Sequence, residues 1–157
     1  MKIRALTLSL LLCVGIVAAA SAVTYYSSDL NGGNVVPPNN SGGIGYAFLS
    51  MNDTNDLLTF TLNYQGMDGQ VTGAEIRRGG VGQNGDLVLR LSDQGFPNGY
   101  QGNLPWNAND VNDLNNGNLY IVFNTDQYPD GEIRGQIQSV AVPTNDTTWG
   151  EIRALYR

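Results

Sequence analysis

Residues 119–137 constrain the fold of this chain more strongly than any other segment. Residues 119–123 form an unbroken run of leucine, aromatic and β-branched side chains, and such a strand needs cover on both faces. A Tyr-Pro-Asp-Gly turn follows at 128–131, where the proline fixes φ and the glycine supplies a positive φ. Residues 132–137 then alternate between two faces, as in a half-buried strand. The segment therefore predicts a β-hairpin inside a sandwich or barrel.

Five residues define the hairpin motif: Tyr128, Pro129, Gly131, Glu132 and Arg134. Glu132 and Arg134 share one face of the second strand and carry opposite charges. The simplest interpretation is an ion pair on the surface, which contributes little to stability. The alternative is that Arg134 reaches back to the turn and fixes the hairpin through charge-assisted hydrogen bonds. The sequence leaves both interpretations open.

The rest of the chain repeats the β pattern at short intervals. Alternating and β-rich runs predict further strands, which lie at residues 23–30, 45–49, 58–64, 71–78 and 87–91. In the second of these runs, Tyr46 and Phe48 share a face. One short helix is predicted at 107–116, where Asn107 is a candidate N-cap and Gly117 a stop signal. The pattern predicts an all-β chain, an antiparallel β-sandwich or barrel with one short helix.

The N-terminus has the organisation of a secretory signal peptide. Lys2 and Arg4 form a positive region, residues 6–19 are apolar, and an Ala-Ser-Ala cleavage site ends at residue 22. Residues 1–22 are therefore predicted to be removed, so that the mature chain begins at Val23. This predicts a secreted protein, extracellular or at the cell surface, with the periplasm as a further possibility. Within the apolar run, the cysteine lacks the preceding small residues of a lipidated cysteine, which argues against a lipoprotein.

Removal of the signal peptide changes the charge and the reactive side chains of the chain. Six basic residues then face 14 acidic ones, because Lys2 and Arg4 are lost from the eight of the full sequence, and the net charge becomes −8. Cys13 is lost too and the sequence has no histidine, so the mature chain has no disulfide. An acidic chain of this kind disfavours nucleic acid and anionic membranes as partners. About 135 residues still suffice for the core of one domain.

The C-terminal part differs from the β-rich body. Residues 23–138 are predicted to form the domain, and residues 139–157 a polar linker with a short tail that is apolar again from residue 149. The tail is interpreted as a last strand or turn packed on the domain. The alternative is a sorting or docking tag. No hydrophobic span of membrane length follows it.

The hairpin motif resembles the closing hairpin of the CHRD (chordin-type) domain. The matching pattern is Tyr120-x-x-x-x-Thr125 followed by Tyr-Pro-x-Gly-Glu-Ile-Arg-Gly-Gln from Tyr128 onward. Val-Val-Pro-Pro at 35–38 is similar to the Glu-Val-Pro-Pro element of that family, with Asn34 where glutamate is usual. The resemblance covers about residues 25–137. It implies an immunoglobulin-like or superoxide-dismutase-like Greek-key barrel that acts as an extracellular binding or structural module.

This sequence departs from the family pattern at the histidines. Glu75 and Arg77 replace those of an Ala-His-Ile-His element, and Asn124 replaces the one in an Asn-Val-His-Thr element. If these three positions meet, they form a polar cluster of glutamate, arginine and asparagine. We interpret such a cluster as structural.

Metal binding and catalysis find little support in the mature sequence. A copper–zinc site needs imidazole or thiolate ligands, which this chain lacks. Calcium is chemically possible at the Asx-rich segments 52–56, 110–118 and 126–130, yet none has the ligand spacing of an EF-hand loop, and Asx turns need no metal. No catalytic carboxylate pair can be recognised among its acidic residues. The sequence therefore predicts neither a metal, nor a cofactor, nor an enzyme.

Aromatic residues in loops raise the question of carbohydrate binding. Tyr100 and Trp106 are candidates for stacking on sugars, although packing on the core is the preferred interpretation. The predicted function is a non-catalytic extracellular binding or structural module whose partner is a protein or a polysaccharide. Two alternatives remain: an extracellular glycan hydrolase that uses acidic residues, for which carboxylates about 5–9 Å apart would be expected, and a self-assembling surface protein. The oligomeric state stays open.

Overall fold

The computed structural model describes residues 23–141, which form nine β-strands, one α-helix and two 3₁₀ turns. The predicted signal peptide 1–22, and the predicted tail from residue 142 on, lie outside these residues. The strands are β1 (Thr24–Asn31), β2 (Ile44–Met51), β3 (Leu57–Gln65), β4 (Val71–Arg78), β5 (Leu87–Ser92), β6 (Tyr100–Pro105), β7 (Leu119–Thr125), β8 (Ile133–Gln136) and β9 (Gln138–Val140).

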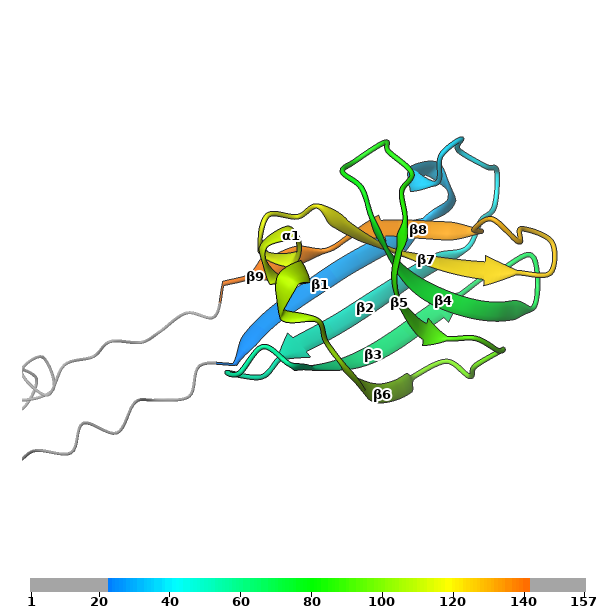
Figure 1. Ribbon diagram of the computed structural model, residues 1–157. Helices are drawn as coiled ribbons and strands as arrows, with labels where there is room; N and C mark the ends of the chain where they lie inside the picture. Colours follow the sequence, from blue (N-terminus) through cyan, green and yellow to red (C-terminus); the bar gives the residue numbers. More distant parts are fainter. Residues whose placement is uncertain (1–22, 142–157) are drawn as a thin grey trace, which may run out of the picture.

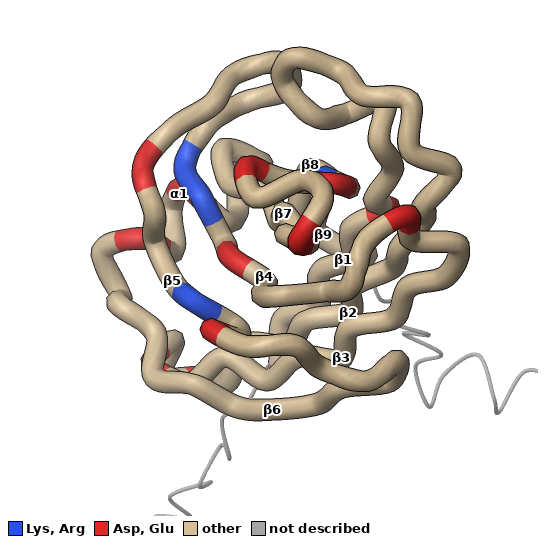
Figure 2. The backbone as a smooth tube through the Cα atoms, turned by 90° about the vertical axis from the view of Figure 1, so that its right-hand side faces the viewer, with Lys and Arg blue, Asp and Glu red and all other residues tan. Residues whose placement is uncertain are grey.

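All strand pairs are antiparallel, and the strands follow one another around a barrel in the order β5-β4-β7-β8-β1-β2-β3-β6, with β9 also paired to β1. Seen along its axis, the sheet forms a nearly closed ring (Figure 2). The two ends of this order, β5 and β6, are not paired with each other. The prediction of an all-β sandwich or barrel with one short helix is confirmed.

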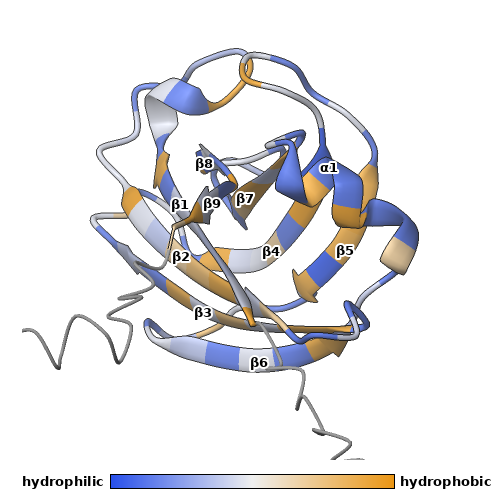
Figure 3. Ribbon diagram, turned by 90° about the vertical axis from the view of Figure 1, so that its left-hand side faces the viewer, coloured by the Kyte–Doolittle hydropathy of each residue, from blue (hydrophilic) through white to orange (hydrophobic). Residues whose placement is uncertain are grey.

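Alternation along the strands places one apolar face inside the barrel. On β3, Leu58, Phe60 and Leu62 are buried while the residues between them face outward. Figure 3 shows this alternation as hydrophobic and hydrophilic bands along the strands. Near the gap between β5 and β6, Phe96 packs edge-on against Phe123, with ring centroids 5.3 Å apart. This loop side chain therefore fills the core where the sheet is open.

The hairpin of β7 and β8 has the predicted form. Every residue of β7 except Asn124 is buried, so this strand is covered on both faces. At the turn, Gly131 has φ +127° and its N–H donates to the carbonyl of Tyr128 at 3.0 Å. The glycine is required here because this backbone conformation is strained for residues with a Cβ atom.

The short helix closes one end of the barrel. The turn η2 (Ala108–Asp110) leads directly into α1 (Val111–Asn115), and the side chain of Asn107 accepts the N–H of Asn109. Leu114 is the buried residue of α1. The predicted N-cap and helix are thus confirmed. No helix within residues 23–141 is both long and apolar enough to cross a membrane.

The last described strand extends past the predicted domain boundary at residue 138. In β9, Ser139 pairs with Tyr26 and Val140 with Tyr25, so the first residues of the predicted linker belong to the sheet. Both β9 and the start of β1 lie at the end of the barrel where α1 is found (Figure 1).

Candidate functional site

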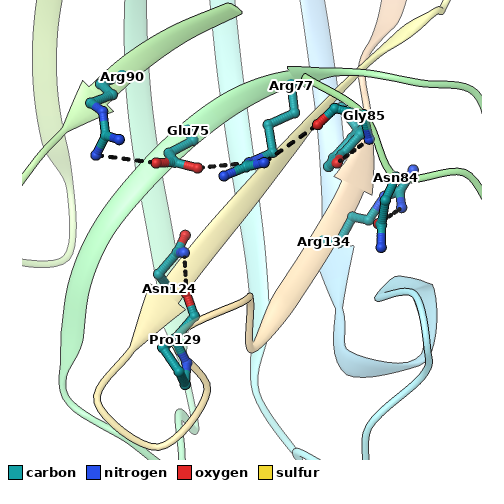
Figure 4. A network of polar contacts seen from close by, with 9 residues as sticks. Glu75, Arg77, Asn84, Gly85, Arg90, Asn124, Pro129 and Arg134 are labelled. Carbon is teal, nitrogen blue, oxygen red and sulfur yellow. Dashed lines mark hydrogen bonds and ion pairs between the residues drawn. The ribbon is translucent and has the colours of Figure 1, made fainter. Parts of the chain in front are cut away.

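Two of the three residues at the family histidine positions are in contact. Glu75 on β4 is 6% exposed, and its Oε2 lies 2.7 Å from Nε of Arg77 (Figure 4). Its other oxygen lies 3.3 Å from Nη1 of Arg90 on β5. Asn124 does not bind this pair, because its Nδ2 donates to the carbonyl of Pro129 at 2.6 Å. The predicted cluster is therefore an ion-pair network of Glu75 with two arginines, next to a separate amide.

A small hollow of about 150 Å³ lies beside this network, and Glu75, Asp93 and Asn124 are among its lining residues. The Oδ1 atom of Asn124 has no hydrogen-bond partner within the described chain. Both oxygens of Glu75 are engaged by guanidinium groups, so this carboxylate is not free to act as an acid, a base or a nucleophile. Among residues 23–141 there is also no group of three acidic side chains placed to hold a metal ion.

Arg134 is buried on the outer side of β8, beneath the loop that joins β4 and β5. Its Nη2 donates to the carbonyls of Gly80 at 2.9 Å and Gln83 at 2.7 Å, and its Nη1 to Oδ1 of Asn84 at 3.2 Å. The guanidinium carbon lies 3.6 Å from the centroid of the Tyr120 ring. Burial lowers the pKa of the Arg134 guanidinium, and the nearby Tyr120 opposes that shift.

These contacts overturn both interpretations of the Glu132 and Arg134 pair. None of the ion pairs in the described chain joins the two residues, and Arg134 binds the β4–β5 loop rather than the turn of its own hairpin. The reason is that Glu132 precedes β8 and does not belong to its alternating pattern. Both side chains are buried, with 0% and 2% of their surfaces exposed, so the pair is not on the surface either.

The carboxylate of Glu132 connects the β1–β2 loop, the β3–β4 loop and the end of β7. Its Oε1 accepts from the hydroxyl of Ser41 and the N–H of Asp68, each at 2.6 Å. Its Oε2 accepts from Thr125 at 2.8 Å and from the N–H of Gly69 at 3.1 Å. Burial raises the pKa of Glu132, but these hydrogen bonds outweigh burial and the net pKa is lowered. The conspicuous charged residues of the hairpin motif therefore have structural roles.

The aromatic residues chosen from the sequence lie mainly in the core. Trp106 is 6% exposed. Tyr100 is partly buried, and its ring packs against Phe60 at 5.9 Å and Phe96 at 5.3 Å between centroids. Trp106 therefore offers no open ring to a sugar, in agreement with the core interpretation.

A different set of aromatic rings faces solvent, on the outer side of β1 and β2. Tyr46 and Phe48 are 41% and 37% exposed, whereas Ala47 and Leu49 between and beside them are fully buried. Tyr25 on β1 stacks on Phe48, with centroids 5.7 Å apart and ring planes 25° apart. We call Tyr25, Tyr46 and Phe48 the aromatic row.

The sheet around the aromatic row is almost free of charge. The strands β2, β3, β6 and β9 contain no charged residue, and β1 contains only Asp29. Figure 2 shows the contrast with the other side of the barrel, where acidic and basic residues lie on β4 and β5. Apart from the apolar pair Leu57 and Pro105, the outward residues of β3 and β6 are amides and hydroxyls: Thr59, Thr61, Asn63, Gln65, Gln101 and Asn103.

Sequence reasoning did not identify the aromatic row because both faces of β2 are apolar. Alternation therefore could not show which face points inward. The register decides it: Ala47 pairs with Leu62 and Leu49 with Phe60, so the smaller β2 residues lie opposite the inward residues of β3. The sequence did contain one usable signal, the clean alternation of β3. Pairing β2 with β3 would have shown which face of β2 points inward.

Comparison with known proteins gives one match. The family model described as the CHRD domain matches residues 26–137. No curated protein and no solved structure matches the chain.

Proposed function

The chain belongs to the CHRD domain family, and on that premise we propose that it is a non-catalytic extracellular binding module whose partner is a polysaccharide. The observation that carries this proposal is the outward orientation of the aromatic row. Exposed aromatic rings gathered on one sheet face mark an interaction site, whereas isolated exposed rings do not. Two of the rings, Tyr25 and Phe48, stack on each other with centroids 5.7 Å apart, which holds both in place on this face.

The surroundings of the platform favour a sugar polymer over a protein partner. Sugar rings offer apolar C–H faces to aromatic rings and hydroxyl groups to neighbouring polar side chains. The outward threonine, asparagine and glutamine residues of β3 supply such hydrogen-bonding groups without charge. Protein interfaces are also rich in aromatic residues but use arginine as an anchor, and this face contains no arginine.

The polar network of Figure 4 does not support a glycan hydrolase. A hydrolase needs one carboxylic acid that can donate a proton and one free carboxylate. Glu75 is bound by Arg77 and Arg90, and Glu132 accepts four hydrogen bonds. Both groups have their hydrogen-bonding capacity committed within the fold. The CHRD family is in general non-enzymatic, which agrees with a binding role.

Secretion of the mature chain is part of the proposal. The predicted signal peptide would place the domain outside the cytoplasm, where polysaccharides of walls, capsules and matrices occur. The net charge of −8 derived for the mature chain would favour neutral polymers over anionic ones.

A glycan array followed by titration calorimetry tests this function. The purified protein is screened against neutral and anionic polysaccharides, and Phe48→Thr is compared with the wild type. We expect the wild type to show saturable binding and Phe48→Thr to raise the Kd by about tenfold. The reason is that one stacked ring contributes about 1 kcal/mol beyond its buried area. Threonine is chosen because it is favourable on an outward strand position.

The matched control is Val81→Ser, which removes an apolar side chain that is 84% exposed on the β4–β5 loop, away from the aromatic row. It should bind like the wild type. Absence of binding to every polysaccharide would overturn the proposal, and so would binding that Phe48→Thr leaves unchanged. Light scattering adds a third outcome: a dimer that Phe48→Thr converts to a monomer would assign the face to self-assembly instead.

A further inference from the structure

A hollow of about 280 Å³ lies at one end of the aromatic row, against the outer face of β1, β2 and β3. Its walls include Asp29, Tyr46, Asn63, Gln65 and Asn98. The volume is at the low end for a small-molecule site and suits a single monosaccharide unit. The hollow is therefore lined by the Tyr46 ring and apolar Ile44 on the one hand and by polar side chains on the other.

Register places three of these residues side by side. Asp29 pairs with Tyr46, and Tyr46 pairs with Asn63 on the next strand. Directly paired residues on one face have Cβ atoms about 5 Å apart. A carboxylate and an amide thus flank the Tyr46 ring on its two sides, within reach of groups on the edge of a ligand that rests on the ring.

The polar side chains of the hollow have unused hydrogen-bonding groups. Within residues 23–141 the side chains of Asp29, Asn63, Gln65 and the hydroxyl of Tyr46 have no hydrogen-bond or ion-pair partner. Asn98 uses only its Oδ1, which accepts the N–H of Tyr64 at 2.9 Å. This differs from the network of Figure 4, where Glu75, Arg77 and Arg134 are bound within the fold.

We infer that this hollow is a sugar subsite, in which one neutral monosaccharide unit of the polymer stacks on Tyr46 and is bound through its hydroxyl groups by Asp29 and Asn63. The inference rests on the proposed polysaccharide function and assigns its specificity. A carboxylate accepts hydrogen bonds from two hydroxyl groups of a sugar at once, and an amide both donates and accepts. These two residue types can therefore distinguish sugars by the arrangement of their neighbouring hydroxyl groups.

The charge of the hollow selects the class of ligand. Asp29 is its one charged wall residue, and no arginine or lysine lines it. A uronic acid or a sulfated sugar would place like charge next to Asp29, which is unfavourable. The subsite therefore takes an uncharged sugar.

The test compares Asn63→Ala and Asp29→Asn with Asn103→Ala. Asn103 also faces outward, on β6, and does not line the hollow, so it matches Asn63 in chemistry and in its outward position on a strand. The probe is the neutral polysaccharide that the wild type binds, with its constituent monosaccharide as a competitor. We expect about a tenfold loss of affinity for Asn63→Ala and for Asp29→Asn, and no loss for Asn103→Ala. The monosaccharide should compete with the polymer on the wild type and fail to do so on Asn63→Ala.

The outcomes separate this inference from the proposed function. If the wild type binds no polysaccharide, the proposed function is wrong, and the subsite with it. If the wild type binds and Phe48→Thr weakens binding, while Asn63→Ala and Asp29→Asn behave like Asn103→Ala, the platform stands and the subsite is wrong. A preference of the wild type for uronic or sulfated polymers would overturn the assignment of a neutral sugar. Unchanged melting temperatures for Asn63→Ala, Asp29→Asn and Asn103→Ala exclude loss of folding as a cause.

Discussion

The guanidinium carbon of Arg134 lies 3.6 Å above the centre of the Tyr120 ring, and the same guanidinium donates to the carbonyls of Gly80 and Gln83. One side chain of β8 therefore joins a ring of β7 to the loop between β4 and β5. Substitution of Arg134 should therefore change the stability of the fold, whereas substitutions in the aromatic row should change binding.

Arg134→Lys should lower the free energy of unfolding by about 3 kcal/mol, because an ammonium group cannot stack flat on Tyr120 and reach all three acceptors. Urea denaturation measures this loss. Hydrogen exchange should rise in residues 79–86, which the arginine holds. Arg90→Lys is the control: its side chain is 57% exposed, so it should stay within about 0.5 kcal/mol of the wild type. Equal losses for both variants would contradict the assigned role of Arg134.

Glu132 should make stability depend on pH. Its folded pKa is below its ordinary value of 4.5, so the carboxylate stabilises the fold above about pH 4.5. That contribution is lost as the pH falls through the lowered pKa. Glu132→Gln should cost about 3 kcal/mol at neutral pH, since charged hydrogen bonds to buried groups are lost.

Urea unfolding over a series of pH values measures this effect. The difference between wild type and Glu132→Gln should shrink as the pH falls below about 4.5. Asp130→Asn, at an exposed position of the same turn, is the control and should follow the wild-type curve. A difference that stays constant down to acid pH would show that ionisation of Glu132 does not contribute.

Adjacent residues of β2 should lose different amounts of stability on substitution. Leu49→Ala should destabilise by about 3 kcal/mol because it opens a cavity at a fully buried position. Phe48→Thr should cost about 1 kcal/mol, the value of the lost stacking on Tyr25. Thermal or urea unfolding of the two variants decides the point, and a larger loss for Phe48→Thr would contradict the orientation of the strand.

Gly135→Ala should destabilise the barrel by about 2 kcal/mol. A Cβ atom at Gly135 would overlap the carbonyl oxygen of Asp29 and the hydroxyl of Ser28, where β8 approaches β1. Gly42→Ala provides the control, because nothing lies within 4 Å of a Cβ atom there. Similar melting temperatures for the two variants would show that β1 moves away at little cost.

Binding of the polysaccharide should depend weakly on ionic strength. The contacts of the aromatic row are apolar, and those of the hollow join Asp29 and Asn63 to neutral hydroxyl groups. Raising sodium chloride from about 0.05 M to about 0.5 M should change Kd by less than about twofold, since screening acts on charge pairs. Calorimetry at both concentrations checks this, and a steep loss of affinity would indicate an anionic ligand.

The fold could be predicted from the sequence where local patterns have one meaning. The clean alternation of β3, the glycine at the 128–131 turn and the cap at Asn107 each led to the observed structure. The partners of Arg134 could not be predicted, because Gly80 and Gln83 are more than 50 positions away and offer only backbone carbonyls. The aromatic row was missed for a related reason, since the inward face of β2 depends on how it pairs with β3.

The position of the aromatic row on β2 has a consequence for the thermodynamics of recognition. Every residue of β2 is paired with both β1 and β3, so its backbone is fixed before any ligand arrives. A platform on such a strand loses little conformational entropy on binding, in contrast to one on a loop that must become ordered. The affinity of this domain should therefore depend on the fit of the ligand to a preorganised surface, and ligands whose shape does not match should be discriminated against rather than accommodated.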